Sequence, residues 1–298
     1  LVVVDETVRP SGAAIDYARI LGIESDPAGF AQADNVHRLP AATNRRGVIV
    51  AGPARAVGTN AATEASNAAL EVLIGLAAAN ADASTAAQID AGRCVRCLTC
   101  LRVCPYRAVA LNGRPQISPS ACERCGICAA ECPREAIRVA GLERTDIRTL
   151  IDAGRPDATP CVVAFCCRRS AAPALRAAVA DGSCWPVTLN IVEVPCAGSI
   201  ASADIFSAFR QGADGVLVLA CHPDNCHSRH GNHLARQRAD QSCAFLDRCG
   251  AGSGRLIFRT LASNMPAEAA QVVTAFSAAL RDLKSNSLCA RTPEKELP

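Results

Sequence analysis

The sequence predicts a multidomain protein in which an α/β segment, a small α+β segment and a second α/β segment follow one another. Its 298 residues are long enough for more than one domain, each with a core of its own. Apolar runs alternate with amphipathic stretches near both ends, which is typical of α/β layers. Between them lies a Cys-dense stretch in which Cys94 to Leu111 matches Cys122 to Val139, and this repeat indicates a small duplicated unit.

The composition excludes several classes of protein. A net charge of +3 is too small to indicate binding to nucleic acid or to a membrane surface. Aromatic residues make up only 3% of the chain, so Ala, Val, Leu and Ile must fill the cores. The 18 Cys do not fit a secreted disulfide scaffold, because such scaffolds are usually short and follow a secretory signal. We therefore expect a cytoplasmic chain whose reduced thiols bind metal.

The first segment carries the signals of an incomplete α/β layer. Strands are predicted at Leu1 to Val4 and within Gly47 to Ala54, and helices near Ala13 to Leu21 and along an Ala-rich stretch. Because the chain starts on an apolar run without an initiator Met, we expect it to begin inside a fold. The most apolar stretch, Ala68 to Ala81, contains Glu71 and is shorter than the roughly 20 residues of a spanning helix, so we interpret it as a buried helix.

Two copies of the pattern Cys-x2-Cys-x2-Cys-x3-Cys-Pro carry the clearest chemical signal. The first three thiolates of each copy lie close along a looping backbone, whereas the fourth follows a helical turn and points the other way. In two-cluster bacterial ferredoxins this fourth Cys binds the other [4Fe-4S] cluster. The pattern therefore assigns one cluster to Cys94, Cys97, Cys100 and Cys132, and the other to Cys122, Cys125, Cys128 and Cys104.

Two further features accompany the repeat. Short Cys spacings also occur in zinc sites, but two tandem copies that both end in Cys-Pro favour iron–sulfur clusters. Asn112-Gly113 between the copies predicts a tight hairpin. The surrounding arginines are either solvated surface charges or cations that favour reduced clusters or dock an acidic partner. They are Arg93, Arg96, Arg102, Arg107, Arg124 and Arg134.

The last segment alternates strands with helices, which predicts a parallel sheet with helices on both faces. The stretch from Gly141 to Pro160, with its Gly, Pro and Asp residues, is the predicted domain boundary. Residues after Ser285 are polar and are expected to form a loose tail. The predicted strands are Val162 to Cys167, Val187 to Cys196, Val216 to Cys221 and Leu256 to Leu261, and the predicted helices lie near 171–181, 200–211, 230–246 and 267–284.

Three of these predicted strands end on a Cys. Because the carboxyl ends of parallel strands form the crevice where α/β sheets bind ligands, Cys167, Cys196 and Cys221 should converge there. Cys226, on the following loop, supplies a fourth thiol, and four Cys suit a [2Fe-2S] cluster. Only one of the adjacent Cys166 and Cys167 can face the site, and we choose Cys167 with Cys166 as the fallback. The other thiols fit small apolar core residues: Cys166, Cys184, Cys243, Cys249 and Cys289.

Four His crowd the loop after the third of these strands and leave alternatives open. They could replace Cys as ligands in a Rieske-type arrangement, or form a mixed Cys and His zinc site. A catalytic Cys and His pair is a third option, although nothing in the sequence indicates a pocket for an acyl or thiol substrate. We favour hydrogen bonds to cluster sulfurs, or caps of the following helix. The residues are His222, His227, His230 and His233.

The predicted strand Gly47 to Ala54 ends on small residues ahead of a helix, where backbone can approach a cofactor closely. The same pattern is common in other α/β turns. Because the stretch contains no Gly-x-Gly-x-x-Gly, the sequence does not predict a complete dinucleotide site there.

Three resemblances follow the chain in order. The first segment resembles the end of the flavoprotein subunit of heterodisulfide reductase, and the Cys repeat resembles the two-cluster ferredoxin insert of that subunit. The last segment resembles the delta subunit of methyl-viologen-reducing hydrogenase. The matching stretches are Val8-Arg-Pro-Ser, Leu21-Gly-Ile-Glu-Ser-Asp-Pro-Ala-Gly-Phe, His37, Leu39-Pro40 and Gly47-Val-Ile-Val-Ala-Gly-Pro-Ala for the first, and Val194-Pro-Cys-Ala-Gly, Gly212-Ala-Asp-Gly-Val-Leu-Val-Leu-Ala-Cys-His-Pro and Cys226-His-x3-Gly-Asn for the last.

The resemblance implies a domain order and its cofactors. Delta subunits of this family carry a [2Fe-2S] cluster, and the same order of domains is similar to the second flavoprotein subunit of the quinone-interacting membrane-bound oxidoreductase. FAD would be completed by another polypeptide or by upstream sequence, with Ala51 and Gly52 as its contacts here. The implied domains are 1–85, the C-terminal remnant of an FAD-binding domain; 86–143, a ferredoxin domain with two [4Fe-4S] clusters; 158–285, the [2Fe-2S] delta domain; and 286–298, a tail.

The resemblance also departs from the family at one point and implies a function. The family has a second Cys soon after the first one of the delta domain, where this chain has Arg169 or Ser170. The implied function is an electron relay in a multi-subunit oxidoreductase, in the cytoplasm or at a membrane complex. It would have no bond-making chemistry of its own, no nucleic-acid partner and no segment inserted in the membrane.

The implied partners are a heterodisulfide reductase-like flavoprotein, further iron–sulfur subunits, and a hydrogenase, dehydrogenase or quinone-linked membrane subunit. The alternative function is a redox or metal sensor, with zinc or a reversible disulfide in the last domain.

Overall fold

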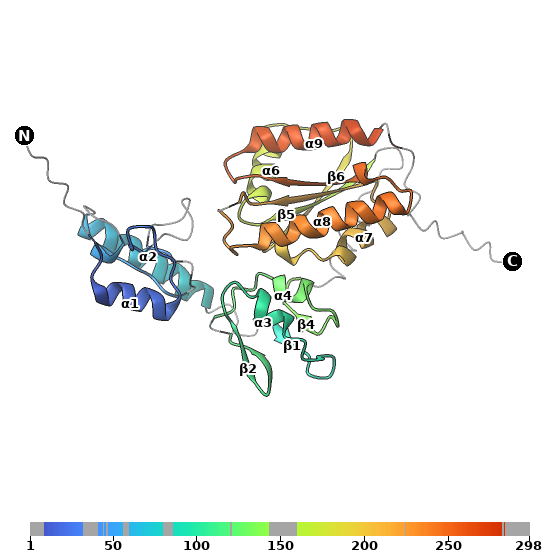
Figure 1. Cartoon of the computed structure of the whole chain (residues 1–298). Coiled ribbons are helices and arrows are strands. Elements are labelled where there is room, and N and C mark those ends of the chain that lie inside the picture. Colours follow the sequence, from blue (N-terminus) through green and yellow to red (C-terminus); the bar gives the residue numbers. More distant parts are fainter. Residues whose placement is uncertain are drawn as a thin grey trace, which may run out of the picture. The chain divides into compact units, whose positions relative to one another are not determined.

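The computed structural model (Figure 1) describes residues 9–31, 41–43, 45, 47–55, 60–79, 86–119, 121–142, 160–223, 225–281 and 283. Contacts divide the chain into two compact units, residues 1–86 with 118–123, and residues 87–117 with 124–298. The predicted strand Leu1 to Val4, most of the predicted linker and the tail lie outside the described residues.

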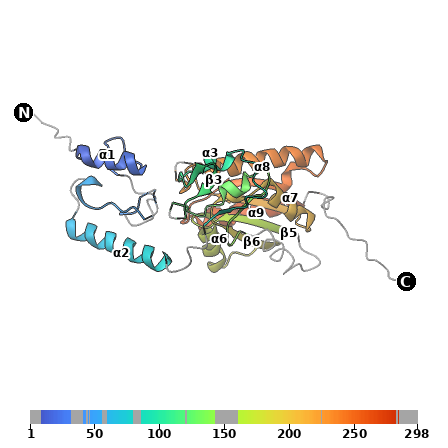
Figure 2. The same ribbon diagram turned by 90° about the horizontal axis from the view of Figure 1, so that it is seen from below.

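The first unit contains two described α-helices, α1 (Gly12–Leu21) and α2 (Ala61–Ala79), both seen lengthwise in Figure 2. The predicted helix near Ala13 to Leu21 is thus confirmed. Ser11 begins α1, because its hydroxyl accepts the N–H of Ala14 at 3.3 Å, and Gly22 ends it with a left-handed φ of 66°. The guanidinium of Arg55 binds the carboxylate of Glu64 on α2 and lowers the pKa of that carboxyl.

The strand predicted within Gly47 to Ala54 is wrong. The described residues form there a single β-bridge between Ala42 and Ile49, followed by the 3-10 turn η1 (Gly52–Ala54). Gly47 and Gly52 adopt φ values of 75° and 80°, which interrupt an extended backbone, and Pro53 has no N–H to donate to a sheet.

The prediction that Ala68 to Ala81 is a buried helix is also wrong for the described residues of α2. Its large apolar side chains are 45 to 62% exposed, because no described element of the first unit packs on that face. They are Leu70, Val72, Leu73, Ile74 and Leu76. No helix in the described part of the chain is long and apolar enough to cross a membrane.

The ferredoxin segment, residues 87–142, contains two short antiparallel pairs of strands. Strand β1 (Gln88–Ile89) pairs with β4 (Ile137–Arg138), and β2 (Val109–Asn112) pairs with β3 (Arg114–Ile117) around Gly113. The predicted hairpin at Asn112-Gly113 is therefore confirmed. The short helices α3 (Thr99–Val103) and α4 (Ile127–Ala130) each follow closely on the second Cys of a motif.

The two motif copies share unusual backbone conformations at equivalent positions. Arg96 and Arg124 have φ of 57° and 55°, and Arg107 and Glu135 have φ of 51° and 50°. L residues seldom adopt such values, so their recurrence at the repeat interval shows that both copies fold into the same tight loop. In each copy this loop turns successive thiols toward one space.

The sheet domain, from residue 160 to the end of α9, has a four-stranded parallel sheet with strand order β6-β5-β7-β8. The predicted parallel sheet is confirmed. Strands β5 and β7 are buried on both faces, which explains their uninterrupted apolar sequences. The strands are β5 (Cys161–Cys167), β6 (Thr188–Val194), β7 (Gly215–Ala220) and β8 (Leu256–Thr260).

Helices cover both faces of this sheet, as predicted (Figure 1). Alternate residues of β5 separate the two cores: Val163 and Phe165 pack with α7 and α8, whereas Val162 and Ala164 pack with α6 and α9. The helices are α6 (Ala171–Ala180), α7 (Ser202–Arg210), α8 (Gly231–Arg248) and α9 (Pro266–Arg281).

Candidate metal centres

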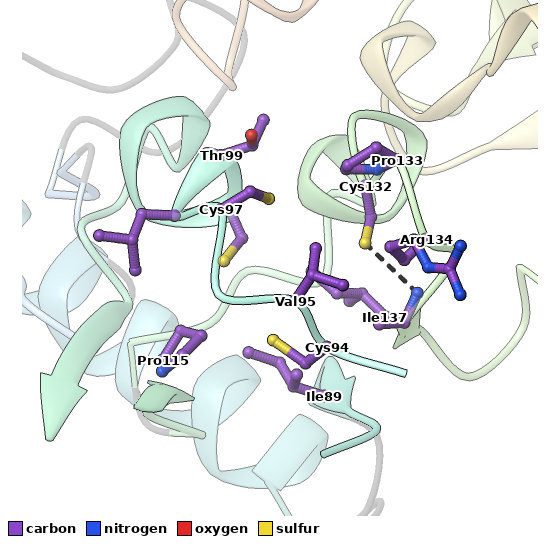
Figure 3. Close-up of a pocket in the computed structure, with 13 residues that line it drawn as sticks. Ile89, Cys94, Val95, Cys97, Thr99, Pro115, Cys132, Pro133, Arg134 and Ile137 are labelled. Atoms are coloured by element: carbon purple, nitrogen blue, oxygen red, sulfur yellow. Dashed lines mark hydrogen bonds between the residues drawn. The ribbon is translucent and has the colours of Figure 1, made fainter. Parts of the chain in front are cut away.

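A pocket with about 340 Å³ of space opens in the ferredoxin segment (Figure 3). It is lined by the four thiols that the sequence assigns to the first cluster, together with apolar side chains such as Ile89 and Val95. Cys94 comes from the loop after β1, Cys97 and Cys100 flank the start of α3, and Cys132 follows α4. The structure therefore brings this predicted set together around one space.

The fourth Cys of each copy is held in the same way. Cys132 Sγ accepts the N–H of Ala136, and Cys104 Sγ accepts the N–H of Ala108, both at 3.3 Å. Each bond closes the turn after a Cys-Pro pair, so the repeated tail of the motif fixes the direction of its last thiol. Donors aimed at sulfur also stabilise the extra negative charge of thiolates bound to iron.

The thiols of the pocket differ in exposure. Cys97 is exposed, and a hydrogen bond from Thr99 lowers the pKa of its thiol. Cys100 is buried, and burial raises the pKa of its thiol. The side chain of Arg102 donates to the carbonyl of Cys97 at 3.3 Å, so a cation lies beside the exposed edge of the pocket.

The second predicted cluster set is described only in part. Cys104, Cys125 and Cys128 are half-buried thiols of the second unit. Cys122 is buried, but it belongs to residues 118–123, which group with the first unit. Its assignment therefore stays a prediction.

In the sheet domain, four thiols meet at the carboxyl edge of the parallel strands. Cys167 ends β5, Cys196 lies just beyond β6, and Cys221 follows β7. Cys226 lies on the loop between β7 and α8. Cys167 Sγ is 4.0 Å from Cys221 Sγ, and Cys226 accepts hydrogen bonds from the thiols of Cys196 and Cys221. The structure thus brings together the four residues predicted for the [2Fe-2S] site.

Hydrogen bonding divides these thiols into proton acceptors and proton donors. The bond from Cys221 lowers the pKa of Cys167 to about 7, and the bond from Cys196 holds the pKa of Cys226 far below its usual range. Donating to these acceptors raises the pKa of Cys196 and of Cys221. Two thiolates are thereby stabilised in a largely buried site, and thiolates are the form that binds iron.

Cys166 lies on the other face of the sheet. It belongs to the core against α6 and α9, and its thiol donates to the carbonyl of Ala164 at 3.3 Å. Burial raises the pKa of this thiol well above its usual value. Of the two adjacent Cys, Cys167 is therefore the one that faces the other three thiols.

Small and polar residues that sequence reasoning missed hold this four-thiol site in shape. A Cβ on Gly231 would overlap Cys196 Sγ, so the start of α8 needs glycine there. Asn232 donates to the carbonyls of Cys221 and His222, at 3.2 and 3.0 Å. The Gly-Asn pair of the motif that starts at Cys226 was the signal, but its role depends on contacts that spacing does not reveal.

The His residues around the site make other contacts than those expected. His222 Nε2 lies 3.4 Å from Met265 Sδ, and His227 Nδ1 lies 2.9 Å from Arg169 Nη1. His230 occupies the N-cap position of α8, but its ring bonds the carbonyl of Val103 at 3.2 Å rather than the helix. At the position where the family has a further Cys, Ser170 hydrogen-bonds Cys167 and lowers its pKa.

The ferredoxin segment contacts this four-thiol site directly. Tyr106 is buried and follows Cys104-Pro105, and its hydroxyl donates to the carbonyl of His227 at 3.1 Å. The same hydroxyl lies 3.1 Å from Ser228 Oγ, and Ser228 in turn hydrogen-bonds Cys196. A short hydrogen-bonded path thus joins a predicted ligand loop of the ferredoxin segment to the thiols at the sheet edge.

Two negative observations complete the description. Among the described residues, no three Cys, His, Asp or Glu side chains are arranged to hold a single metal ion. At the turn proposed for flavin, a Cβ on Gly52 would have no heavy atom within 4 Å, and Ala51 is exposed. The described residues therefore form no cradle there, and we derive no flavin contact from them.

Comparison with known proteins divides the chain at the same places. The family described as the delta subunit of methyl-viologen-reducing hydrogenase matches residues 162–284, and the 4Fe-4S dicluster domain matches residues 86–133. The ferredoxin:CoB-CoM heterodisulfide reductase of Methanosarcina mazei contains one polypeptide that is 32% identical over 268 residues, 88% of this chain. The chain spans only about a third of the length of that relative, 33%.

Iron-sulfur subunits of F420-non-reducing hydrogenases match the last segment. The protein of Archaeoglobus profundus is 33% identical over 99 residues, which are 33% of this chain and 72% of the relative. That of Methanococcus voltae is 30% identical over 105 residues, 35% of this chain and 73% of the relative. Both groups of relatives are subunits of oxidoreductases, as the sequence predicts for this chain. Through its sheet domain, the chain belongs to the family of hydrogenase delta subunits.

Proposed function

We propose that this chain is an electron-relay subunit of an oxidoreductase of the heterodisulfide reductase type. It would hold two [4Fe-4S] clusters in the ferredoxin segment and one [2Fe-2S] cluster at the sheet edge. The observation that carries the proposal is that two separate sets of converging thiols lie in one compact unit and are joined through Tyr106 and Ser228. A protein that only stores metal has no need for such a connection.

The residues present fit these groups. The pocket of the ferredoxin segment is lined by four thiols, the number that a [4Fe-4S] cluster requires. At the sheet edge the thiols associate as the pairs Cys167 with Cys221 and Cys196 with Cys226, which suits a cluster with two thiolates on each iron. Iron–sulfur clusters supply one-electron transfer without making or breaking bonds in a substrate.

The protein residues then determine where electrons can enter and leave. Cys97 is exposed, so the first pocket offers an edge to a partner in solution. The four thiols at the sheet edge are largely enclosed, and the Tyr106 contact lies on the side of the ferredoxin segment. The proposed route therefore runs between the two sites inside the chain.

The outer members of the proposed route come from the resemblance and the relatives. On one side we place a heterodisulfide reductase-like flavoprotein that holds the flavin. On the other side we place a hydrogenase, dehydrogenase or quinone-linked subunit, in the cytoplasm or at a membrane complex. Co-purification of such subunits with the full chain would support this assignment, and a stable, monomeric chain that recovers no partner would contradict it.

Iron and acid-labile sulfide analysis, combined with EPR of the reduced full chain, tests the proposal. We expect about ten irons per chain and signals of both cluster types. About eight irons without a [2Fe-2S] signal would contradict the site at the sheet edge. Stoichiometric zinc in an EPR-silent sheet domain would instead favour a metal or redox sensor.

A further inference from the structure

Ile127 connects the two sets of thiols by packing. It lies between Cys125 and Cys128 and is fully buried. A Cβ on Gly198 would lie 2.9 Å from Ile127 Cγ1, and a Cβ on Gly231 would lie 3.4 Å from Ile127 Cδ1 and overlap Cys196 Sγ. Two glycines therefore leave the space that Ile127 fills, and Gly231 contacts both Ile127 and Cys196.

An ion pair fixes this contact from the side. Arg238 on α8 donates to the carbonyls of Gly198, at 3.0 Å, and Ile200. The same guanidinium binds Glu131 Oε1 through Nε at 3.0 Å and through Nη2 at 2.7 Å. Glu131 is the C-cap residue of α4 and precedes Cys132. One side chain thus joins the loop after Cys196 to the helix that carries Ile127 and Cys128.

The burial of this pair distinguishes it from an ordinary surface ion pair. The side chain of Arg238 is 9% exposed and that of Glu131 is 28% exposed. A guanidinium that is largely withdrawn from water is stable only when its N–H groups have partners, and four hydrogen bonds supply them here. Such a pair contributes more to a defined geometry than to stability.

We propose that Arg238 and Glu131 are positioning residues that hold the ferredoxin loop around Ile127 against the four-thiol site and thereby fix the spacing across which the relay works. The proposal rests on the proposed function. It adds that the interface has one geometry, set by this ion pair, and that the thiols of both sites keep their ligand roles when the pair is broken.

Two variants of the full chain break the pair from opposite sides. Glu131→Ala removes the partner in the ferredoxin segment and leaves Arg238 bonded to Gly198 and Ile200. Arg238→Ala removes the partner in the sheet domain. Arg236→Ala is the matched control, because Arg236 lies on the same helix in a pair with Asp240 whose side chains are 69% and 68% exposed. Glu131→Asp keeps the charge and tests rescue.

The first readout is the magnetic interaction between the reduced centres, seen as splitting or broadening in EPR. We expect it to be lost in Glu131→Ala and Arg238→Ala, kept in the control and partly restored in Glu131→Asp, with iron content unchanged throughout. An interaction of wild-type size in both Ala variants would overturn the proposal. Iron lost from both Ala variants would also overturn it, because the pair would then support the ligand loops rather than their spacing.

The second readout does not need bound iron. Hydrogen exchange of the backbone around Ile127 and Ile200 should accelerate about tenfold or more in the two Ala variants and not in Arg236→Ala, because the contact that protects it opens. Unchanged exchange would overturn the proposed role of the pair. If the wild-type chain bound no iron, the proposed function would fail, while the exchange data would still decide whether the pair holds the interface.

Discussion

In the ferredoxin segment the thiols of the pocket lie on loops within a few residues of one another, and one of them, Cys97, is exposed. At the edge of the sheet, by contrast, Cys167, Cys196 and Cys221 follow three different strands and are buried. The first geometry is stored in local backbone conformation, including residues such as Arg96 with positive φ. The second is stored in the order of the strands and in the close packing around Gly231.

This difference has a consequence for the effect of mutations. A site built from one loop should tolerate changes elsewhere in the chain but lose its cluster when a loop thiol is removed. A site assembled from distant strands should also respond to packing changes that leave every thiol in place. The two sites can therefore be separated by experiment.

The largest expected effect is the loss of one complete cluster from the loop site. In Cys94→Ser the pocket loses one of its four thiols, and we expect about four irons fewer per chain while the [2Fe-2S] signal remains. Iron analysis and EPR of the reduced protein measure this. Loss of the [2Fe-2S] signal as well would show that the two sites do not form independently.

A smaller loss separates two neighbouring Cys of the sheet domain. Cys167→Ala should remove about two irons and the [2Fe-2S] signal, because its side chain faces the other three thiols. Cys166→Ala should keep both, since Cys166 lies in the core on the opposite face. The reverse result in the same iron and EPR measurements would make Cys166 the ligand.

The next effect comes from packing alone. In Gly231→Ala the new Cβ would overlap Cys196 Sγ, so we expect partial loss of the [2Fe-2S] signal and a decrease of about 1–3 kcal/mol in the free energy of unfolding. Gly254→Ala is the control, because its Cβ would meet Leu283 at an ordinary 3.5 Å. Equal behaviour of the two variants in EPR and denaturant titration would rule out a special role for Gly231.

The smallest effect concerns thiol reactivity in the chain without iron. The pKa of Cys97 is lowered by Thr99, whereas burial raises the pKa of Cys100 and of Cys166. Since the thiolate is the reactive form, a brief alkylation near neutral pH should label Cys97 first, and raising the pH should increase labelling of Cys100 later. Mass spectrometry measures the order, and labelling of Cys166 before Cys97 would contradict the burial described here.

The sequence predicts the fold of the sheet domain well, because its strands are continuous apolar runs and its helices are amphipathic. The strand predicted to end on Cys167 does end there. The ligand repeat is equally clear, since local spacing alone encodes the loop site. Where local signals were weak, as in Gly47 to Ala54, the glycines and Pro53 determined the backbone instead.

The remaining features depend on contacts between residues far apart in the chain. Nothing near Tyr106 indicates that its hydroxyl meets Ser228, and nothing near Glu131 indicates Arg238 as its partner. The prediction for the His residues failed for the same reason, since His230 bonds the carbonyl of Val103 in another segment. Composition also could not reveal that the apolar face of α2 is exposed among the described residues.

Mössbauer spectroscopy of the full chain grown on ⁵⁷Fe tests most directly whether loop thiols and sheet-edge thiols hold different clusters. We predict two components, with about a fifth of the iron in a [2Fe-2S] environment and the rest in [4Fe-4S] environments. The [2Fe-2S] component should be absent from Cys226→Ser. A single [4Fe-4S] component in the wild-type chain would contradict a cluster at the edge of the sheet.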